Sequence, residues 1–138
     1  MECAEVIVLD THALVWWASG DAQLSGPARR AIAAELKASD GRILVSSISA
    51  WEIALLIQKG RLVLSMNVDE WLQTVAEVDA IAFVSVDTDI ALQSTRLPGK
   101  FHADPADRMI VALARHHAVP LITADKKIRA YRHVKTVW

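Results

Sequence analysis

The chain has 138 residues, of which 53% are hydrophobic and 22% charged, so we expect residues 1–138 to form one folded domain. This composition excludes a disordered chain, and no apolar run reaches the roughly 18 residues that span a bilayer. The N-terminal segment lacks the basic start and long apolar stretch of a secretory signal. The single cysteine, Cys3, cannot form an internal disulfide and is expected to be a small packing residue. These features predict a cytoplasmic protein without membrane association.

The formal net charge of −1 hides an uneven distribution of charge. Residues 100–138 contain eight lysines and arginines against three acids, whereas residues 1–99 contain seven against thirteen. The lysines and arginines of this C-terminal third could bind phosphate groups. From the charge alone, a solvated helix face is the favoured explanation.

Apolar, β-branched runs alternate with helical patterns along the chain. Strands are expected at 5–9, 42–46, 81–86 and 120–123, with a fifth, edge strand at 134–137. Helices are expected over 12–18, 27–38, 46–60, 70–78, 88–97, 106–118 and 125–131. Candidate N-caps are Asn67 or Asp69, Asp87, and Asp104. This alternation predicts an α/β fold in which a parallel sheet carries helices on both faces.

Two acids follow predicted strands. Asp10 comes directly after the strand at 5–9, and Asp125 follows the strand at 120–123 by one residue. The carboxyl ends of parallel strands lie at one rim of the sheet, where α/β proteins place their functional crevice. Each of these residues is also a good helix N-cap, which is the competing explanation.

Glu52 lies on the apolar stripe of its predicted helix, together with Ile48, Leu55 and Leu56. A carboxylate on such a stripe costs free energy unless it is paired or holds a metal ion. The alternative is a glutamate at the edge of the stripe that reaches water or pairs with Lys59.

Asp107 repeats this pattern, because Ile110 and Val111 place it along the apolar face of its helix. As a first-turn acid it also interacts favourably with the helix dipole, which is the simpler explanation. Asp104, with Pro105 at the first helical position, is expected to cap this helix, although it could act as an outer acid.

Four carboxylates at one rim repel each other, so the cluster requires protons or cations to neutralise it. An all-oxygen ligand set suits Mg²⁺ or Mn²⁺ better than zinc. We expect Asp10 and Asp107 to be the principal ligands. Glu52 and Asp125 would bind a second ion or orient metal-bound water. Metal ions held by carboxylates beside a basic surface indicate phosphoryl chemistry, such as hydrolysis of a phosphodiester.

Several neighbouring residues are candidates for auxiliary roles. Thr11 and Thr123 would hydrogen-bond the acids, or they are ordinary turn hydroxyls. Arg108, Lys126 and Lys127 flank the acids and are candidates for contacts with substrate phosphates, or they are simple surface charges.

His12 and the tryptophans are harder to assign. His12 lies beside Asp10 and could position a phosphate, although a solvated or capping histidine is the simpler reading. Trp16 and Trp17 cannot both face one core, so one of them could lie at a protein interface, with packing as the simpler alternative. Trp51 could flank the site, although we expect it to be packed.

With these residues in place, the chain resembles the PIN-domain family, in particular VapC-type toxins of bacterial VapBC toxin–antitoxin pairs. The resemblance rests on Asp10 in LDTH, Glu52 in SAWE, Asp107 in DPADRMIVALA and Asp125 in TAD. It implies a three-layer α/β/α sandwich with a central, mostly parallel five-stranded sheet. It also implies an Mg²⁺- or Mn²⁺-dependent endoribonuclease that acts on RNA, forms a homodimer and is inhibited by a small cognate antitoxin.

Two other classes of function compete with this interpretation. A receiver-like phospho-acceptor domain would require an acid pair after the first strand, where the chain has Asp10-Thr11. A catalytically silent RNA-binding or interaction module of the same fold would use the acids only as caps. A nucleotide-cofactor enzyme is disfavoured, because no glycine-rich phosphate loop follows a strand.

Overall fold

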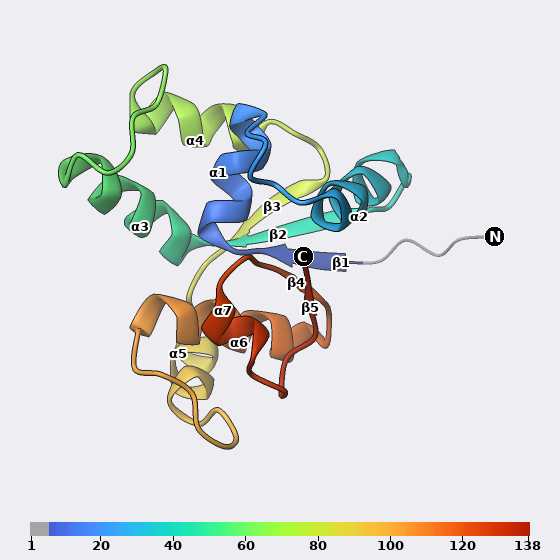
Figure 1. The fold of residues 1–138 in the computed structure, drawn as a ribbon, viewed down its shortest axis with the longest axis vertical. Helices are drawn as coiled ribbons and strands as arrows, with labels where there is room; N and C mark the ends of the chain where they lie inside the picture. Colours follow the sequence, from blue (N-terminus) through green and yellow to red (C-terminus); the bar gives the residue numbers. More distant parts are fainter. Residues whose placement is uncertain (1–5) are drawn as a thin grey trace.

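The computed structural model describes residues 6–138 and contains one sheet with helices on both faces (Figure 1). The strands follow the order β3-β2-β1-β4-β5, and every neighbouring pair is parallel. Their bounds are β1 Val6–Leu9, β2 Arg42–Ser46, β3 Ile81–Val84, β4 Leu121–Ile122 and β5 Thr136–Val137. The α/β/α fold and the edge position of the last strand are thus confirmed. The expectation for Cys3 lies outside the described residues.

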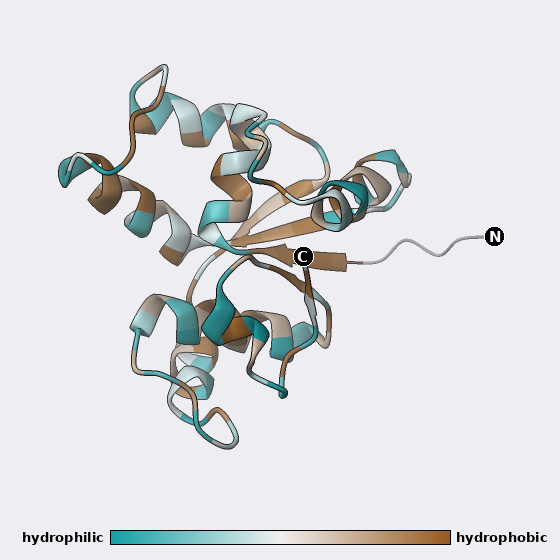
Figure 2. Cartoon of the chain, in the orientation of Figure 1, coloured by the Kyte–Doolittle hydropathy of each residue, from teal (hydrophilic) through white to brown (hydrophobic). Residues whose placement is uncertain are grey.

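The helices divide between the two faces of the sheet (Figure 1). Their bounds are α1 Thr11–Ser19, α2 Gly26–Lys37, α3 Ser47–Gln58, α4 Val68–Ala76, α5 Thr88–Thr95, α6 Pro105–His117 and α7 Lys126–Arg129. Helices α1–α4 share a core with Ile7 and Leu9 of β1, whereas α5–α7 share a core with Val8. This alternation is the two-residue period of a strand buried on both faces, and the strands are accordingly hydrophobic (Figure 2).

Side-chain caps begin the helices where the sequence predicts them. Asn67, Asp87 and Asp104 cap α4, α5 and α6, and each accepts a 2.9 Å hydrogen bond from the backbone N–H three residues later. Asn67 rather than Asp69 is therefore the cap of α4. None of the helices within residues 6–138 is long and apolar enough to cross a membrane.

The order of the strands creates the crevice that holds the site. The chain proceeds outward from β1 through β2 to β3, and then returns to the other side of β1 as β4. Ligands of open α/β sheets bind beyond the carboxyl ends of strands at such a reversal. Leu9 pairs with Ile122, so the next residues, Asp10 and Thr123, emerge side by side at this point.

Candidate active site

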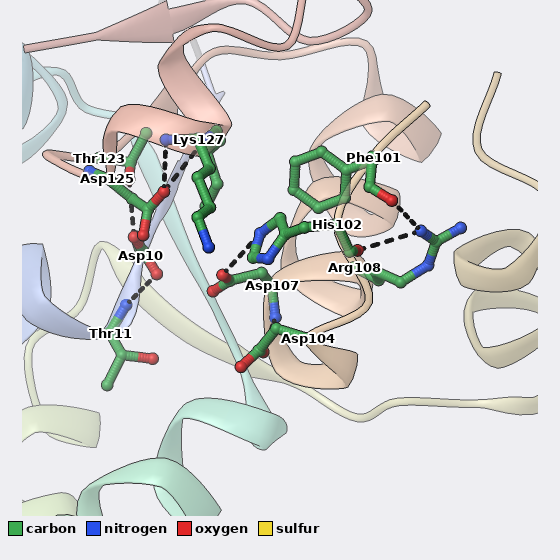
Figure 3. A network of polar contacts seen from close by, with 11 residues as sticks. Asp10, Thr11, Phe101, His102, Asp104, Asp107, Arg108, Thr123, Asp125 and Lys127 are labelled. Carbon is green, nitrogen blue, oxygen red and sulfur yellow. Dashed lines mark hydrogen bonds and ion pairs between the residues drawn. The ribbon is translucent and has the colours of Figure 1, made fainter. Parts of the chain in front are cut away.

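The predicted acids meet in one cavity of about 430 Å³ at the carboxyl ends of β1 and β4. Asp10, Glu52, Asp107 and Asp125 line it, and Asp104 joins them. Figure 3 shows Asp10 and Asp125 on one side of the cavity and Asp104 and Asp107, from the start of α6, on the other. The fold therefore brings together residues that are separated by as much as 115 positions in the sequence, from Asp10 to Asp125.

Asp10 is held by two short hydrogen bonds and is only 6% exposed. The backbone N–H of Thr11 donates to Oδ1 at 2.8 Å, and the hydroxyl of Thr123 donates to Oδ2 at 2.6 Å. Burial raises the pKa of Asp10, and Asp125 adds to this effect, whereas the bonds from Thr123 and Thr11 and the nearby His12 lower the pKa. The carboxyl group is thus fixed in position but costly to ionise.

Asp125 combines a capping role with its place in the cavity. Its backbone N–H donates to the hydroxyl of Thr123 at 3.0 Å, which links it to Asp10. Its Oδ1 atom caps α7 by accepting from the N–H groups of Lys127 and Ile128 at 2.8 and 3.0 Å. The cap therefore orients the carboxylate that lines the cavity.

Glu52 is anchored to the first helix rather than to a lysine. The hydroxyl of Thr11 lies 2.5 Å from Oε1 of Glu52 and 2.8 Å from the hydroxyl of the fully buried Ser49. In the part of the chain that the structure describes, no ion pair joins Glu52 to Lys59. Burial raises the pKa of Glu52, the bond from Thr11 opposes this shift, and Asp10 contributes a smaller increase.

The carboxyl group of Asp107 has a strongly raised pKa. Burial, followed by the charges of Asp10, Asp104, Asp125 and Glu52 in that order, raises its pKa to about 8. These four charges act on Asp107 only because they share its cavity. The expected repulsion among converging acids is therefore present in the structure.

His102 is a neighbour of the cluster that sequence reasoning missed. Its Nε2 atom lies 3.0 Å from Oδ2 of Asp107 (Figure 3). Its ring contacts the ring of Phe101 in an edge arrangement, with centroids 4.5 Å apart. It comes from the loop before α6, and no ligand spacing in the sequence indicates this contact. Ser49 was missed as well, although its position three residues before Glu52 on the same helix was an available signal.

The three candidates for phosphate contacts differ in their position relative to the acids. The guanidinium of Arg108 donates to the carbonyls of Ser94, Phe101 and His102 at 2.8, 3.0 and 3.2 Å, so it is directed away from the acids (Figure 3). Lys127 is exposed, and its side chain is directed toward the gap between Asp10 and Asp107 (Figure 3). Lys126 is exposed on α7. The structure thus brings Lys127, but not Arg108, to the acid cluster.

The structure confirms some expectations for the aromatic residues near the site and contradicts one. Trp16 lines the acid cavity, and Trp16 and Trp17 are both half-buried and packed against the core, as the simpler expectation had it. His12 is exposed at the edge of the cavity, with its ring 5.6 Å from that of Trp16. The expectation that Trp51 is packed was wrong, because this residue is 55% exposed on α3. It points outward because Ser49 and Ile53, each two positions away and about 200° around the helix, take the buried positions.

A compact triad within the cluster fits a divalent cation. Glu52, Asp104 and Asp107 each offer a carboxylate oxygen, and these oxygens lie within 4.8 Å of one another. Asp10 lies outside this group, and its two oxygens accept hydrogen bonds from Thr11 and Thr123. The all-oxygen donor set and the mutual repulsion of the acids suit a hard ion such as Mg²⁺ or Mn²⁺. Asp104 is therefore both the cap of α6 and a candidate ligand.

The parallel α/β/α sandwich and the carboxylate cluster at its strand reversal are the features by which this protein can be classified. The model of the PIN domain family matches residues 7–134, and the chain belongs to that family. It is 36% identical over 134 residues to ribonuclease VapC22 of Mycobacterium tuberculosis, with 96% of this chain and 98% of the relative covered. The membership expected from the sequence motifs is thereby confirmed.

Solved structures of similar fold come from toxin–antitoxin systems. VapBC2 from Rickettsia felis, bound to a DNA fragment from its promoter, matches with a TM-score of 0.67 at 14% identity, covering 95% of this chain and 96% of that one. VapC20 of M. tuberculosis, a toxin that cleaves the sarcin–ricin loop, matches with a TM-score of 0.61 at 16% identity, covering 94% and 98%. At these identities the structural similarity establishes the fold.

Proposed function

We propose that this protein is a divalent-metal-dependent endoribonuclease, the toxin of a type II toxin–antitoxin pair that a small VapB-type antitoxin inhibits. The observation that carries the proposal is the convergence of five carboxyl groups on one cavity, those of Asp10, Glu52, Asp104, Asp107 and Asp125. The pKa of Asp107, which burial and then the charges of the other four raise to about 8, is consistent with this convergence. Such a cluster is costly without a cation, and the 36% identity to a ribonuclease over nearly the whole chain supports RNA as the substrate. A cytoplasmic location and a homodimer complete the proposal.

The acidic residues of the cavity bind the metal ion or orient water. Glu52, Asp104 and Asp107 hold a Mg²⁺ or Mn²⁺ ion, and Asp10 faces them as a further ligand. A bound ion of this kind polarises the scissile phosphate and lowers the pKa of an attacking water. Asp125 orients water, or binds a second ion, from the opposite wall.

Two threonines and one lysine support this arrangement. Thr123 holds Asp10 and Asp125 together, and Thr11 holds Glu52, so the carboxylates keep their positions before substrate arrives. Lys127 reaches toward the cavity and provides a positive charge for the substrate phosphate.

The test is RNA cleavage by the purified protein with Mg²⁺ or Mn²⁺ and, separately, with EDTA. We expect cleavage only with the metal. Asp10→Asn and Glu52→Gln should reduce it by more than about 100-fold, the upper range for residues that merely orient metal ligands. The matched control is Asp69→Asn, an exposed acid on α4, which should keep wild-type activity. Metal-independent binding of RNA without cleavage would instead support the catalytically silent module.

A further inference from the structure

A second cavity, of about 460 Å³, lies beside the acid cluster and has the opposite charge. Three exposed cations line it, Lys100, Lys127 and Arg132, and none of the described residues at its wall is acidic. Within residues 6–138 none of the three forms an ion pair. Their charges are therefore available to an anionic ligand, and the volume lies within the range of about 300–1,000 Å³ of ligand pockets.

Aromatic rings form the other part of this wall. The ring of the half-buried Phe101 lies 4.7 Å from that of Tyr131 and 4.5 Å from that of His102, measured between centroids. The ring of His133 continues the series, 5.3 Å from Tyr131. Rings beside a row of cations are the features with which proteins bind single-stranded nucleic acid, since bases stack on the rings and phosphates meet the charges.

Hydrogen bonds fix the cavity from both sides. The Tyr131 hydroxyl donates to the carbonyl of Pro98, which ties the loop before α6 to the C-terminal segment. Arg108, on α6, donates to the carbonyls of Phe101 and His102 in the same loop. The aromatic wall is thus formed before any ligand binds, which lowers the entropy lost on binding.

The two cavities meet at His102 and Lys127. The Nε2 atom of His102 lies 3.0 Å from Asp107 of the acid cluster, and the backbone N–H of Lys127 donates to Asp125 at 2.8 Å. Figure 3 shows both side chains between Phe101 and the acids. A polymer with one unit in the basic cavity would therefore present its next unit to the acid cluster.

We propose that the basic cavity binds a nucleotide of single-stranded RNA adjoining the scissile phosphate, with its base on Phe101 and its phosphates on Lys100, Lys127 and Arg132. This inference rests on the proposed ribonuclease function. An acidic peptide is the rival ligand, but it would use the cations without the aromatic wall. The cavity therefore favours RNA, and its place beside the acids makes it a determinant of which phosphodiester is cleaved.

The test measures binding of a fluorescently labelled single-stranded oligoribonucleotide by anisotropy, in EDTA, over a series of salt concentrations. Each phosphate contact contributes about 0.7 to the slope of log K against log salt for single strands. The double variant Lys100→Gln/Arg132→Gln should therefore lower the slope by about 1.4. Phe101→Leu should weaken binding by about fivefold or more without changing the slope.

A matched control removes two exposed cations from the opposite layer of the fold. Arg30→Gln/Lys37→Gln on α2 makes the same change of charge and should leave the slope within about 0.3, less than half of one phosphate contact. Thermal melting confirms that each variant is folded. Equal losses of slope in both double variants would overturn the proposal, because they would indicate a general charge effect.

Cleavage of RNA in Mn²⁺ separates the failure of this inference from that of the proposed function. If the wild type cleaves RNA and the cavity variants bind like the control, the cavity has no role and the ribonuclease proposal stands. If the wild type neither binds nor cleaves RNA, both proposals fail. If the cavity variants lose binding to a glutamate-rich peptide but still bind RNA like the wild type, the cavity belongs to a protein partner instead.

Discussion

The hydroxyl of Thr123, at the end of β4, donates a 2.6 Å hydrogen bond to Oδ2 of Asp10, at the end of β1. The same hydroxyl oxygen accepts a 3.0 Å bond from the backbone N–H of Asp125. One fully buried side chain therefore connects two acids that lie 115 residues apart. The strand pairing of Leu9 with Ile122 makes this contact, so the geometry of the site is a direct consequence of the sheet.

Removing this hydroxyl should destabilise the protein. Thr123→Val keeps the volume of the side chain but leaves Oδ2 of the buried Asp10 without its donor, which costs about 1–3 kcal/mol. Urea denaturation measures the change in the free energy of unfolding. Thr74→Val on α4 is the matched control, since its exposed hydroxyl bonds only the carbonyl of Glu70, and we expect a change within about 0.5 kcal/mol. Equal effects at the two sites would contradict this account.

Thr11 should control the affinity for metal through Glu52. Thr11→Val removes the 2.5 Å bond to Glu52 and frees its carboxylate to rotate, so the affinity for Mn²⁺ should fall by about 10–100-fold. Thr11→Ser keeps the hydroxyl and should restore most of that affinity. Calorimetric titration of both variants provides the measurement, and a serine variant as weak as the valine variant would assign Thr11 a packing role only.

The stability of the metal-free protein should depend on pH through Asp107. Its pKa is about 8 in the folded state and near 3.8 in the unfolded chain, so unfolding releases a proton between these values. The unfolded state binds fewer protons there, and the stability contributed by this group is lost as pH rises from about 4 to about 8. Thermal melts in EDTA across this range should show the decline.

Asp107→Asn serves as the comparison for the pH dependence. It removes the titrating group and should flatten the decline, because asparagine stays neutral in both states. A decline of the same steepness in this variant would show that other groups cause it. Excess Mn²⁺ at pH 8 should restore stability to the wild type by binding the ionised cluster.

Arg108 should support the fold rather than bind phosphate. Its guanidinium bridges three backbone carbonyls, so Arg108→Ala leaves these acceptors unpaired and should cost about 1–3 kcal/mol in the free energy of unfolding. Arg108→Lys should recover little, since an ammonium group is compact and cannot span the three acceptors. Arg30→Ala, an exposed arginine on α2, should change stability by less than about 0.5 kcal/mol. A stable Arg108→Ala protein would contradict this role.

Periodicity and local chemistry explain which features could be predicted from the sequence. Buried strands, capped helices and parallel crossovers follow from short-range patterns, and these patterns also direct Asp10 and Asp125 to one rim. Glu52 and Asp107 could be selected because the sequence pattern places each on a predicted apolar helix face. For Asp107 the structure has this face, whereas the buried positions of α3 are Ser49 and Ile53. The contact of Thr11 with Glu52 depends on how α1 packs against α3, which a one-dimensional pattern does not contain.

Loops and long side chains account for what the sequence did not reveal. His102 reaches Asp107 only through the path of the loop between α5 and α6. Arg108 follows Asp107 in the sequence, but consecutive helix positions point about 100° apart, so its side chain leaves the site. Asp104 was expected mainly as a cap, and the structure shows that one residue can both cap α6 and join the acid triad.

Titration calorimetry with Mn²⁺ at pH 7 measures whether the converging carboxylates bind a divalent cation. Because the pKa of Asp107 is about 8, binding should release a proton, and the measured heat should vary with the ionisation enthalpy of the buffer. We predict that binding is weakened and proton release is reduced in Asp107→Asn, whereas Asp69→Asn behaves like the wild type. An absence of Mn²⁺ binding, or identical binding and proton release in Asp107→Asn, would contradict the account.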